Sequence, residues 1–200
     1  AATGTVEDRL VERGLALAAG NPRFLIDALR LAAERQPGVA AGLPVTLAEL
    51  HGERVRLLPP PGRRAMWIAA IVCAVLPPEL IDAAQLAELV GRGLLENEDG
   101  VLRLASVETR AAALADARVH GGWRELHGGL AQALAARAAD PAAVAALWLE
   151  SDDRRRAIPH LRAAGDRAAA LHDHATAVTA YDQGLDLLPA APEMRELHAR

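Results

Sequence analysis

Lysine is absent from this chain of 200 residues, and its 22 basic residues are all arginine. A phosphate-binding loop of the Gly-x-x-x-x-Gly-Lys-Ser/Thr type needs a lysine that reaches the phosphates, so the chain contains no such loop. Phosphoryl transfer needs that loop together with a carboxylate that holds a metal ion. We therefore expect no nucleotide hydrolysis, and no other enzyme activity, from this chain by itself.

Cysteine and aromatic residues are also scarce. The single cysteine, Cys73, excludes an internal disulfide and any zinc site built from several cysteines. Aromatic residues make up 2% of the chain whereas 46 residues are alanine, which favours helices and excludes an all-β fold. Because 52% of the residues are hydrophobic and the net charge is only −4, disorder is excluded and no nucleic-acid footprint is visible.

Long hydrophobic segments are missing as well. The apolar run Ala65–Leu76 has 12 residues, whereas a membrane-spanning helix needs about 20. We expect this run to form a buried core helix, and we expect no association with membranes. Charged residues come early in the chain and no apolar signal segment follows them, so we expect a cytoplasmic protein. The chain begins without methionine, which is compatible with a piece of a larger protein.

Apolar periodicity and Gly/Pro breaks predict a mainly α fold. Thr46 and Glu49 have the spacing of a capping box, and Pro59–Gly62 is interpreted as a hard break. The helices expected from these patterns span residues 6–19, 22–36, 44–58, 63–75, 81–90, 107–117, 119–139, 141–149, 154–171, 174–188 and 193 onward.

One segment has the period of two that is typical of strands. Leu94–Glu96 and Val101–Leu104 flank a turn that contains Asp99 and Gly100, which predicts a short β-hairpin. Helices followed by a small hairpin and another helix are the order of a winged helix.

The region before Pro189 matches the spacing of a tetratricopeptide repeat, a pair of helices with small residues at their contact. Gly165 and Ala177 are the expected small residues, and Tyr181 is the expected large packing residue. The matched positions are Leu161, Ala164, Gly165, Ala168, Ala177, Tyr181, Gly184 and Pro189. The alternative interpretation is an ordinary helical hairpin.

Weak motifs follow one another along the chain in a characteristic order. They are Leu15–Leu29 with its Gly20-Asn21-Pro22, Leu43–Leu47, Arg54–Leu58, the apolar helix with Ala69-Ala70, Leu86–Leu95 and Trp123–Ala131. Together they resemble the STAND class of signalling ATPases, which includes the large LuxR-type bacterial transcription regulators. The resemblance implies a helical lid segment in residues 1–37, a winged-helix domain in 38–118, and tetratricopeptide-like helical hairpins in 119–200.

The resemblance also implies two positions close to a nucleotide. Pro22 would pack near the adenine of ATP or ADP bound by the parent protein. Ser106 stands where the family has a winged-helix histidine that reaches the phosphate. A serine hydroxyl can donate a hydrogen bond but cannot carry the positive charge of an imidazolium. We expect no metal site, no catalytic residue and no cofactor held by this chain alone.

The resulting hypothesis is a non-catalytic regulatory and protein-interaction segment of a STAND-like bacterial signalling ATPase. Its winged helix would relay nucleotide state to a helical-repeat arm, and its partner would be a protein or an upstream ATPase core. A free-standing helical-repeat scaffold without a nucleotide link is the first alternative. A DNA-binding winged helix is the second, although acidic residues at the wing tip disfavour it.

Three polar clusters have a functional and an ordinary interpretation. His172-Asp173-His174 could bind a metal, but a turn is expected. His120 and His127 are expected two turns apart on one helix, in surface or capping roles. Arg154–Arg156 could bind an anion, but a solvated helix face with balanced charge is expected.

Overall fold

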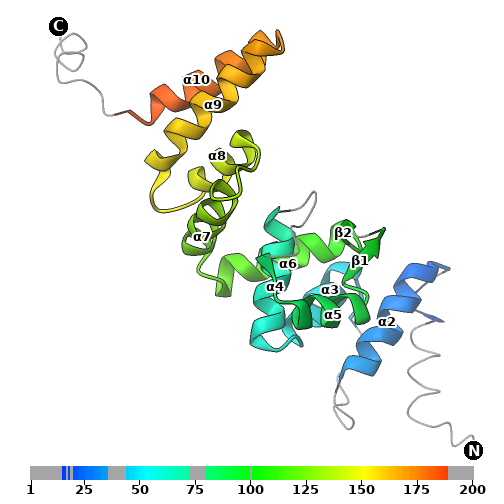
Figure 1. Ribbon diagram of the computed structural model, residues 1–200. Helices are drawn as coiled ribbons and strands as arrows, with labels where there is room; N and C mark the ends of the chain where they lie inside the picture. Colours follow the sequence, from blue (N-terminus) through cyan, green and yellow to red (C-terminus); the bar gives the residue numbers. More distant parts are fainter. Residues whose placement is uncertain are drawn as a thin grey trace, which may run out of the picture. The chain divides into compact units, whose positions relative to one another are not determined.

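The computed structural model describes residues 15, 16, 18, 20–35, 44–72, 80–99 and 101–188. Within this part of the chain the fold is mainly α, with nine α-helices, one 3-10 turn and a single antiparallel hairpin (Figure 1). Cys73, most of the helix expected over 6–19 and the helix expected from 193 lie outside the described residues. The chain divides into two compact units, Ala1–Gly121 and Gly122–Arg200.

The first unit has the element order that was expected of a winged helix. A preceding helix α2 is followed by three helices, the hairpin and a last helix. Their bounds are α2 Pro22–Glu34, α3 Leu47–Arg56, α4 Pro60–Val72, α5 Ala83–Gly91, β1 Leu95–Glu98, β2 Val101–Leu104 and α6 Val107–His120.

Local sequence explains where these helices begin. The Asn21 side chain accepts hydrogen bonds from two backbone amides at the start of α2, and the predicted Thr46–Glu49 capping box is present at α3. The hard break expected over Pro59–Gly62 is wrong in detail, because α4 already begins at Pro60. Proline is tolerated in the first turn of a helix, where its missing N–H would have no partner in any case.

The predicted hairpin is confirmed, although its first strand is Leu95–Glu98 and not Leu94–Glu96. Leu95 pairs with Leu104 and Glu98 pairs with Val101, so the two strands are antiparallel neighbours. Asp99 has a φ of 52°, the left-handed conformation that short hairpin turns require. The strands and α3–α6 contribute to one core, and α4 is central to it as expected. Its buried residues include Val55, Met66, Ala70, Leu89, Leu94, Leu95, Leu102 and Ala113.

The expected helix over 119–139 is wrong at its start. Helix α6 continues to His120, and Gly121 and Gly122 separate it from α7, Trp123–Ala135. Glycine is a poor helix residue, and Gly122 adopts a left-handed φ of 60°. His120 and His127 therefore belong to different helices and not to one.

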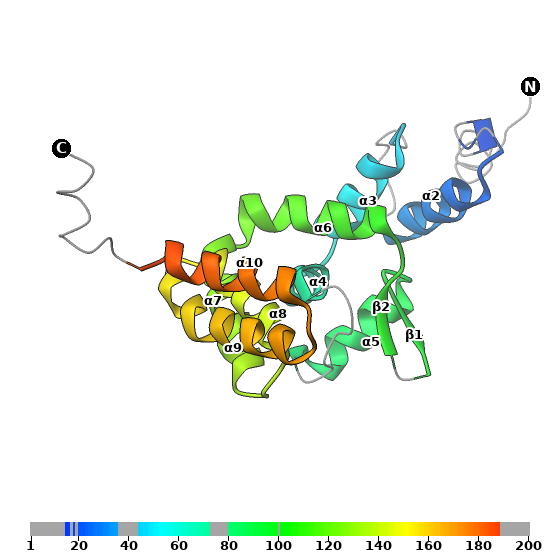
Figure 2. The same cartoon turned by 90° about the horizontal axis from the view of Figure 1, so that it is seen from above.

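The second unit consists of α7, α8 Pro141–Leu149, a 3-10 turn Arg154–Arg156, α9 Ala157–Ala170 and α10 His174–Asp186. Helices α9 and α10 lie side by side (Figures 1 and 2). They touch where the sequence predicted, because a Cβ added at Gly165 would lie 2.5 Å from Cε1 of Tyr181. Ala177 and Gly184 are buried at the same contact.

Candidate functional site

Pro22 and Ser106, the two positions that the resemblance placed near a nucleotide, lie at neighbouring helix ends. Pro22 is the exposed first residue of α2, and Ser106 is the N-cap of α6. Arg23, next to Pro22, donates a hydrogen bond of 2.7 Å from Nη2 to the carbonyl oxygen of Ala105. The fold therefore brings the two positions to one region of the first unit.

The N-terminus of α6 already holds a negative charge from its own chain. Ser106 Oγ accepts a hydrogen bond of 3.0 Å from the backbone amide of Thr109. The Glu108 carboxylate is hydrogen-bonded by its own backbone amide and by Ser106, which keeps the pKa of Glu108 below its ordinary value. A phosphate approaching Ser106 would meet this carboxylate and would have to compete with it.

A buried arginine joins α2 to the helices that follow it. The side chain of Arg54, on α3, is 0% exposed. Its Nη1 donates to Asp27 Oδ1 at 3.2 Å, and its Nη2 donates to Glu34 Oε1 at 2.7 Å. Nη2 also donates to the carbonyl oxygen of Arg92, directly after α5. One guanidinium thus ties two carboxylates of α2 to the turn that leads into β1.

A second branch of this network passes through His51. The His51 Nδ1 atom lies 3.1 Å from Thr109 Oγ1, and Thr109 Oγ1 lies 2.9 Å from Ser106 Oγ. On its other side, His51 Nε2 lies 3.4 Å from Asp27 Oδ2, and neither of these two buried atoms makes a hydrogen bond within ordinary limits. Polar side chains therefore connect the start of α6 to the middle of α2.

The charge state of Asp27 follows from this setting. Burial by itself would raise the pKa of the carboxyl, but the interaction with His51 and the charges of Arg54 and Arg23 outweigh burial. The pKa of Asp27 consequently lies below its ordinary value. Asp27 is therefore a carboxylate at neutral pH and holds α2 against α3 through charged contacts.

The order Thr109, His51, Asp27 is that of a nucleophile, a base and an orienting acid. Thr109 does not act as a nucleophile, because the residue is 0% exposed and lies inside the first unit, where a substrate does not reach its hydroxyl. A nucleophile must reach a substrate, so the geometry supports a structural network that links three helices.

The contact between α2 and the elements that follow it, hereafter the joint, also includes apolar side chains on the same face of α2. Phe24, Ala28 and Leu31 pack with Leu50 of α3 in a small cluster separate from the main core. The opposite face of α2 exposes a stripe with helical spacing, formed by Pro22, Ile26, Leu29 and Ala33. Ile26 is 50% exposed and Leu29 is 43% exposed. Helix α2 thus has two apolar faces, and α3 covers one of them.

A second polar cluster holds α4 to α6. Arg63 makes two hydrogen bonds to the Asp116 carboxylate, and Trp67 Nε1 donates to Asp116 Oδ2 at 2.8 Å. Burial alone would raise the pKa of Asp116, but the hydrogen bonds from Arg63 and Trp67 lower it below its ordinary value. His120 also lies against this cluster, 3.1 Å from Arg63 Nη2. Its role is thus local to the α4–α6 contact.

The surface that a DNA-binding winged helix would use is not basic. Around α5 the exposed residues are Asp82, Ala83, Ala84, Ala87 and Gly91. The tip of the hairpin exposes Glu96, Asn97, Glu98 and Asp99, and Arg103 is paired with Glu98 at 3.5 Å. This charge distribution repels phosphate.

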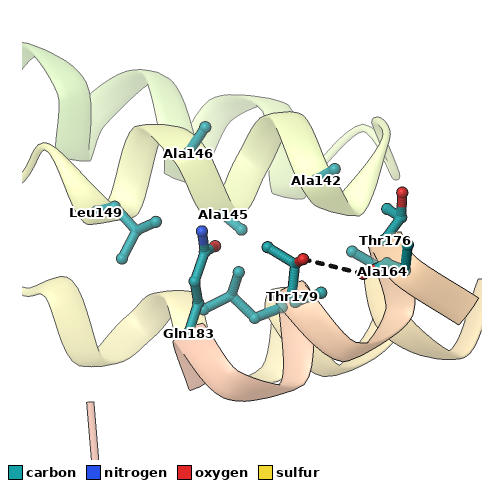
Figure 3. A pocket seen from close by; sticks show the side chains of 11 residues that line it. Ala142, Ala145, Ala146, Leu149, Ala164, Thr176, Thr179 and Gln183 are labelled. Carbon is teal, nitrogen blue, oxygen red and sulfur yellow. Dashed lines mark hydrogen bonds between the residues drawn. The ribbon is translucent and has the colours of Figure 1, made fainter. Parts of the chain in front are cut away.

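In the second unit, α8, α9 and α10 enclose an open groove of about 350 Å³ (Figure 3). Leu161 and Ala164 of α9 line it. Small residues with helical spacing form its two walls, so that the helices leave room between them. The walls consist of Ala142, Ala145, Ala146 and Leu149 from α8 and of Ala175, Thr176, Thr179, Ala180 and Gln183 from α10.

The remaining polar clusters have local roles. No group of metal-binding side chains occurs among the described residues, and Asp173 caps α10 by accepting a hydrogen bond from the Thr176 amide. Arg156 lies over the Trp148 ring at 5.0 Å. The expected surface role of His127 is wrong, because the residue is buried and its Nδ1 lies 2.7 Å from the Trp123 carbonyl oxygen.

Sequence reasoning singled out Pro22 and Ser106 but missed the residues that form the joint. Asp27 lies among Phe24, Ala28 and Leu31 on the inner face of α2, where an apolar residue is expected. A charged residue at such a position signals a buried network, because an unpaired buried charge is costly. His51 and Arg54 sit in the same way on the inner face of α3.

Comparison with family models, with curated proteins and with solved structures finds no match for this chain. Among the described residues, no helix has both the length and the apolar character needed to cross a membrane.

Proposed function

We propose that this chain is a non-catalytic regulatory and protein-interaction segment of a STAND-like signalling ATPase, and that the parent protein is a transcription regulator. In this role α2 belongs to the lid that follows an upstream ATPase core, and the winged helix relays nucleotide state to the helical arm. ATP or ADP is held by the parent protein, with Pro22 on the adenine side and Ser106 on the phosphate side. A rigid-body shift of the winged helix against the core transmits the signal.

The observation that carries this proposal is the two-sided character of α2. One face is fastened to the winged helix by Arg54, Asp27 and Glu34. The other face exposes the stripe that contains Ile26 and Leu29. A helix with apolar residues on both faces is typical of a segment that lies between two bodies, as a lid between a core and a winged helix does.

The first test is the complete reading frame that encodes this chain. The proposal requires a Lys-bearing phosphate-binding loop upstream of residue 1, and its absence would overturn the proposal. With the complete protein, Arg54→Gln is expected to change the basal rate of ATP hydrolysis, because it loosens the joint between α2 and the winged helix. The exposed Arg64→Gln is the matched control, and an equal effect of both variants contradicts the relay. The 200-residue chain alone is expected to hydrolyse no ATP.

The groove in Figure 3 favours a second candidate, a helical-repeat scaffold that binds a protein partner and has no nucleotide link. The reading frame separates the two functions, because a scaffold needs no upstream phosphate-binding loop. Ala146→Arg fills the groove of a scaffold and is expected to abolish partner binding, while it leaves the first unit unchanged.

A further inference from the structure

Four polar contacts, hereafter the relay, cross the first unit from α2 to the start of α6. His51 Nε2 lies 3.4 Å from Asp27 Oδ2, within the distance of an ion pair, and His51 Nδ1 lies 3.1 Å from Thr109 Oγ1. Thr109 Oγ1 lies 2.9 Å from Ser106 Oγ, and Ser106 makes the last contact, with the Glu108 carboxylate. Asp27, His51 and Thr109 are buried, and Glu108 is half-buried. The inner members therefore depend on one another for their hydrogen bonds.

Both ends of the relay are carboxylates. Although burial opposes it, the interaction with His51 and the charges of Arg54 and Arg23 keep the pKa of Asp27 below its ordinary value. Hydrogen bonds from its own backbone amide and from Ser106 lower the pKa of Glu108 in the same way. An ionised carboxylate accepts hydrogen bonds and donates none. Each end of the relay must therefore receive a proton from its neighbour.

The protons along the relay can be counted. Four contacts need four protons if each of them is to be a hydrogen bond. The hydroxyl groups of Ser106 and Thr109 supply one proton each. His51 must supply the other two, one from each ring nitrogen, and a histidine with both nitrogens protonated is an imidazolium. A neutral His51 leaves one contact without a proton, and a hydrogen bond left unmade in the interior is costly.

We propose that His51 is a buried imidazolium and that its second proton is a pH-sensitive lock on the contact between α2, α3 and α6. The charged groups around the ring are Asp27 and Arg23 from α2, Arg54 from α3 and Glu108 from α6. Loss of one proton from His51 breaks the relay at one contact, so the joint loosens as the pH rises. The lock acts within this chain and needs no upstream ATPase core.

Nitrogen-15 NMR of the histidine rings measures the charge of His51 directly, and the variant His51→Gln identifies its signals among the seven histidines. At neutral pH both ring nitrogens of His51 are expected to carry a proton. Thr109→Val removes the acceptor of the Nδ1 proton, so in this variant His51 is expected to be neutral and to keep only the proton that faces Asp27. Thr179→Val removes an exposed helical hydroxyl from α10 and is the matched control, in which His51 stays charged. A bare ring nitrogen on His51 in the unmodified chain overturns the proposal, as does an imidazolium that persists in Thr109→Val.

Hydrogen exchange of the α2 amides tests the lock itself. Protection factors, which correct for the intrinsic effect of pH on exchange, are measured from about pH 6 to about pH 9, where histidine loses its proton. In the unmodified chain the protection of α2 is expected to fall several-fold over this range, while that of α9 stays constant. His51→Gln keeps a donor for Asp27 and an acceptor for Thr109 but does not titrate, so its α2 protection is expected not to change with pH. Constant α2 protection in the unmodified chain overturns the lock, and so does an equal fall in His51→Gln.

Discussion

Individual glycines in this protein differ in how closely other side chains approach them. Gly165 is the clearest case, because the Tyr181 ring occupies the space where a side chain would begin. Gly129 lies in the interior of α7, and a Cβ added there would meet no atom within 4 Å. The same residue type is thus required at one position and dispensable at the other.

Gly165→Ala is therefore predicted to lower the free energy of unfolding, whereas Gly129→Ala is not. Alanine has a higher helix propensity than glycine, so each change by itself stabilises its helix by roughly 0.5–1 kcal/mol. At Gly165 the added methyl group collides with Tyr181, and overpacking costs about 1–3 kcal/mol. Urea unfolding should show Gly165→Ala destabilised and Gly129→Ala unchanged or stabilised. A stabilised Gly165→Ala variant would mean that α9 and α10 do not meet at this position.

Asp116 makes the stability of the first unit dependent on acid. Its pKa is lower in the folded protein than the ordinary value of about 3.9. The carboxylate therefore stabilises the fold above that value, and this contribution is lost as the pH falls through the folded pKa. Asp116→Asn should lower the stability of the first unit at pH 7. In this variant stability should also fall less steeply as the pH drops below about 4, which thermal unfolding at a series of pH values measures. The exposed Asp182→Asn is the control, and an undiminished decline in Asp116→Asn would contradict the assignment.

At the scale of elements, α2 is attached to α3 by a small apolar cluster and a buried charge network. A buried ion pair adds little net stability over an apolar contact, but breaking one side leaves uncompensated charge. The joint is therefore specific in its geometry and sensitive to single substitutions.

Arg54→Met is predicted to destabilise the first unit by about 3–5 kcal/mol, because Asp27 and Glu34 lose their buried partner. Hydrogen exchange of the α2 amides should accelerate more than that of α4. Replacing all three residues by apolar ones, in Arg54→Met/Asp27→Leu/Glu34→Met, should recover part of the loss. A triple variant as unstable as the single one would show that packing, and not stranded charge, causes the effect.

At the scale of the whole molecule, the chain forms two compact units that divide between Gly121 and Gly122. Each unit has buried residues of its own, so local changes should remain local. Arg54→Met is expected to move only the unfolding transition of residues 1–121, and Gly165→Ala only that of 122–200. Hydrogen exchange with mass spectrometry follows the unfolding of each unit separately. If either variant changed the unfolding of both units, the chain would be a single cooperative body.

The sequence by itself determined most of the secondary structure and the contacts that residues make with close neighbours along the chain, such as helix caps. Alanine content, capping residues, the Asp99–Gly100 turn and the small residues at 165 and 177 act over a few positions, so the pattern predicts them directly. The prediction from the pattern was wrong at Pro60, where α4 already begins, and at Gly121–Gly122, which separate α6 from α7. At such positions one or two neighbouring residues determine whether a helix begins, ends or continues.

Only the tertiary structure decided which side chains far apart in the chain share a buried environment. Arg54 meets Asp27, Glu34 and the Arg92 carbonyl because α2, α3 and the end of α5 pack together. Ser106, interpreted from the sequence as a position near phosphate, caps α6 and touches the His51 network. The physical reason is that a charged side chain has the same sequence signature at the surface and in the interior. Its partners, and with them its role, are chosen when the helices assemble.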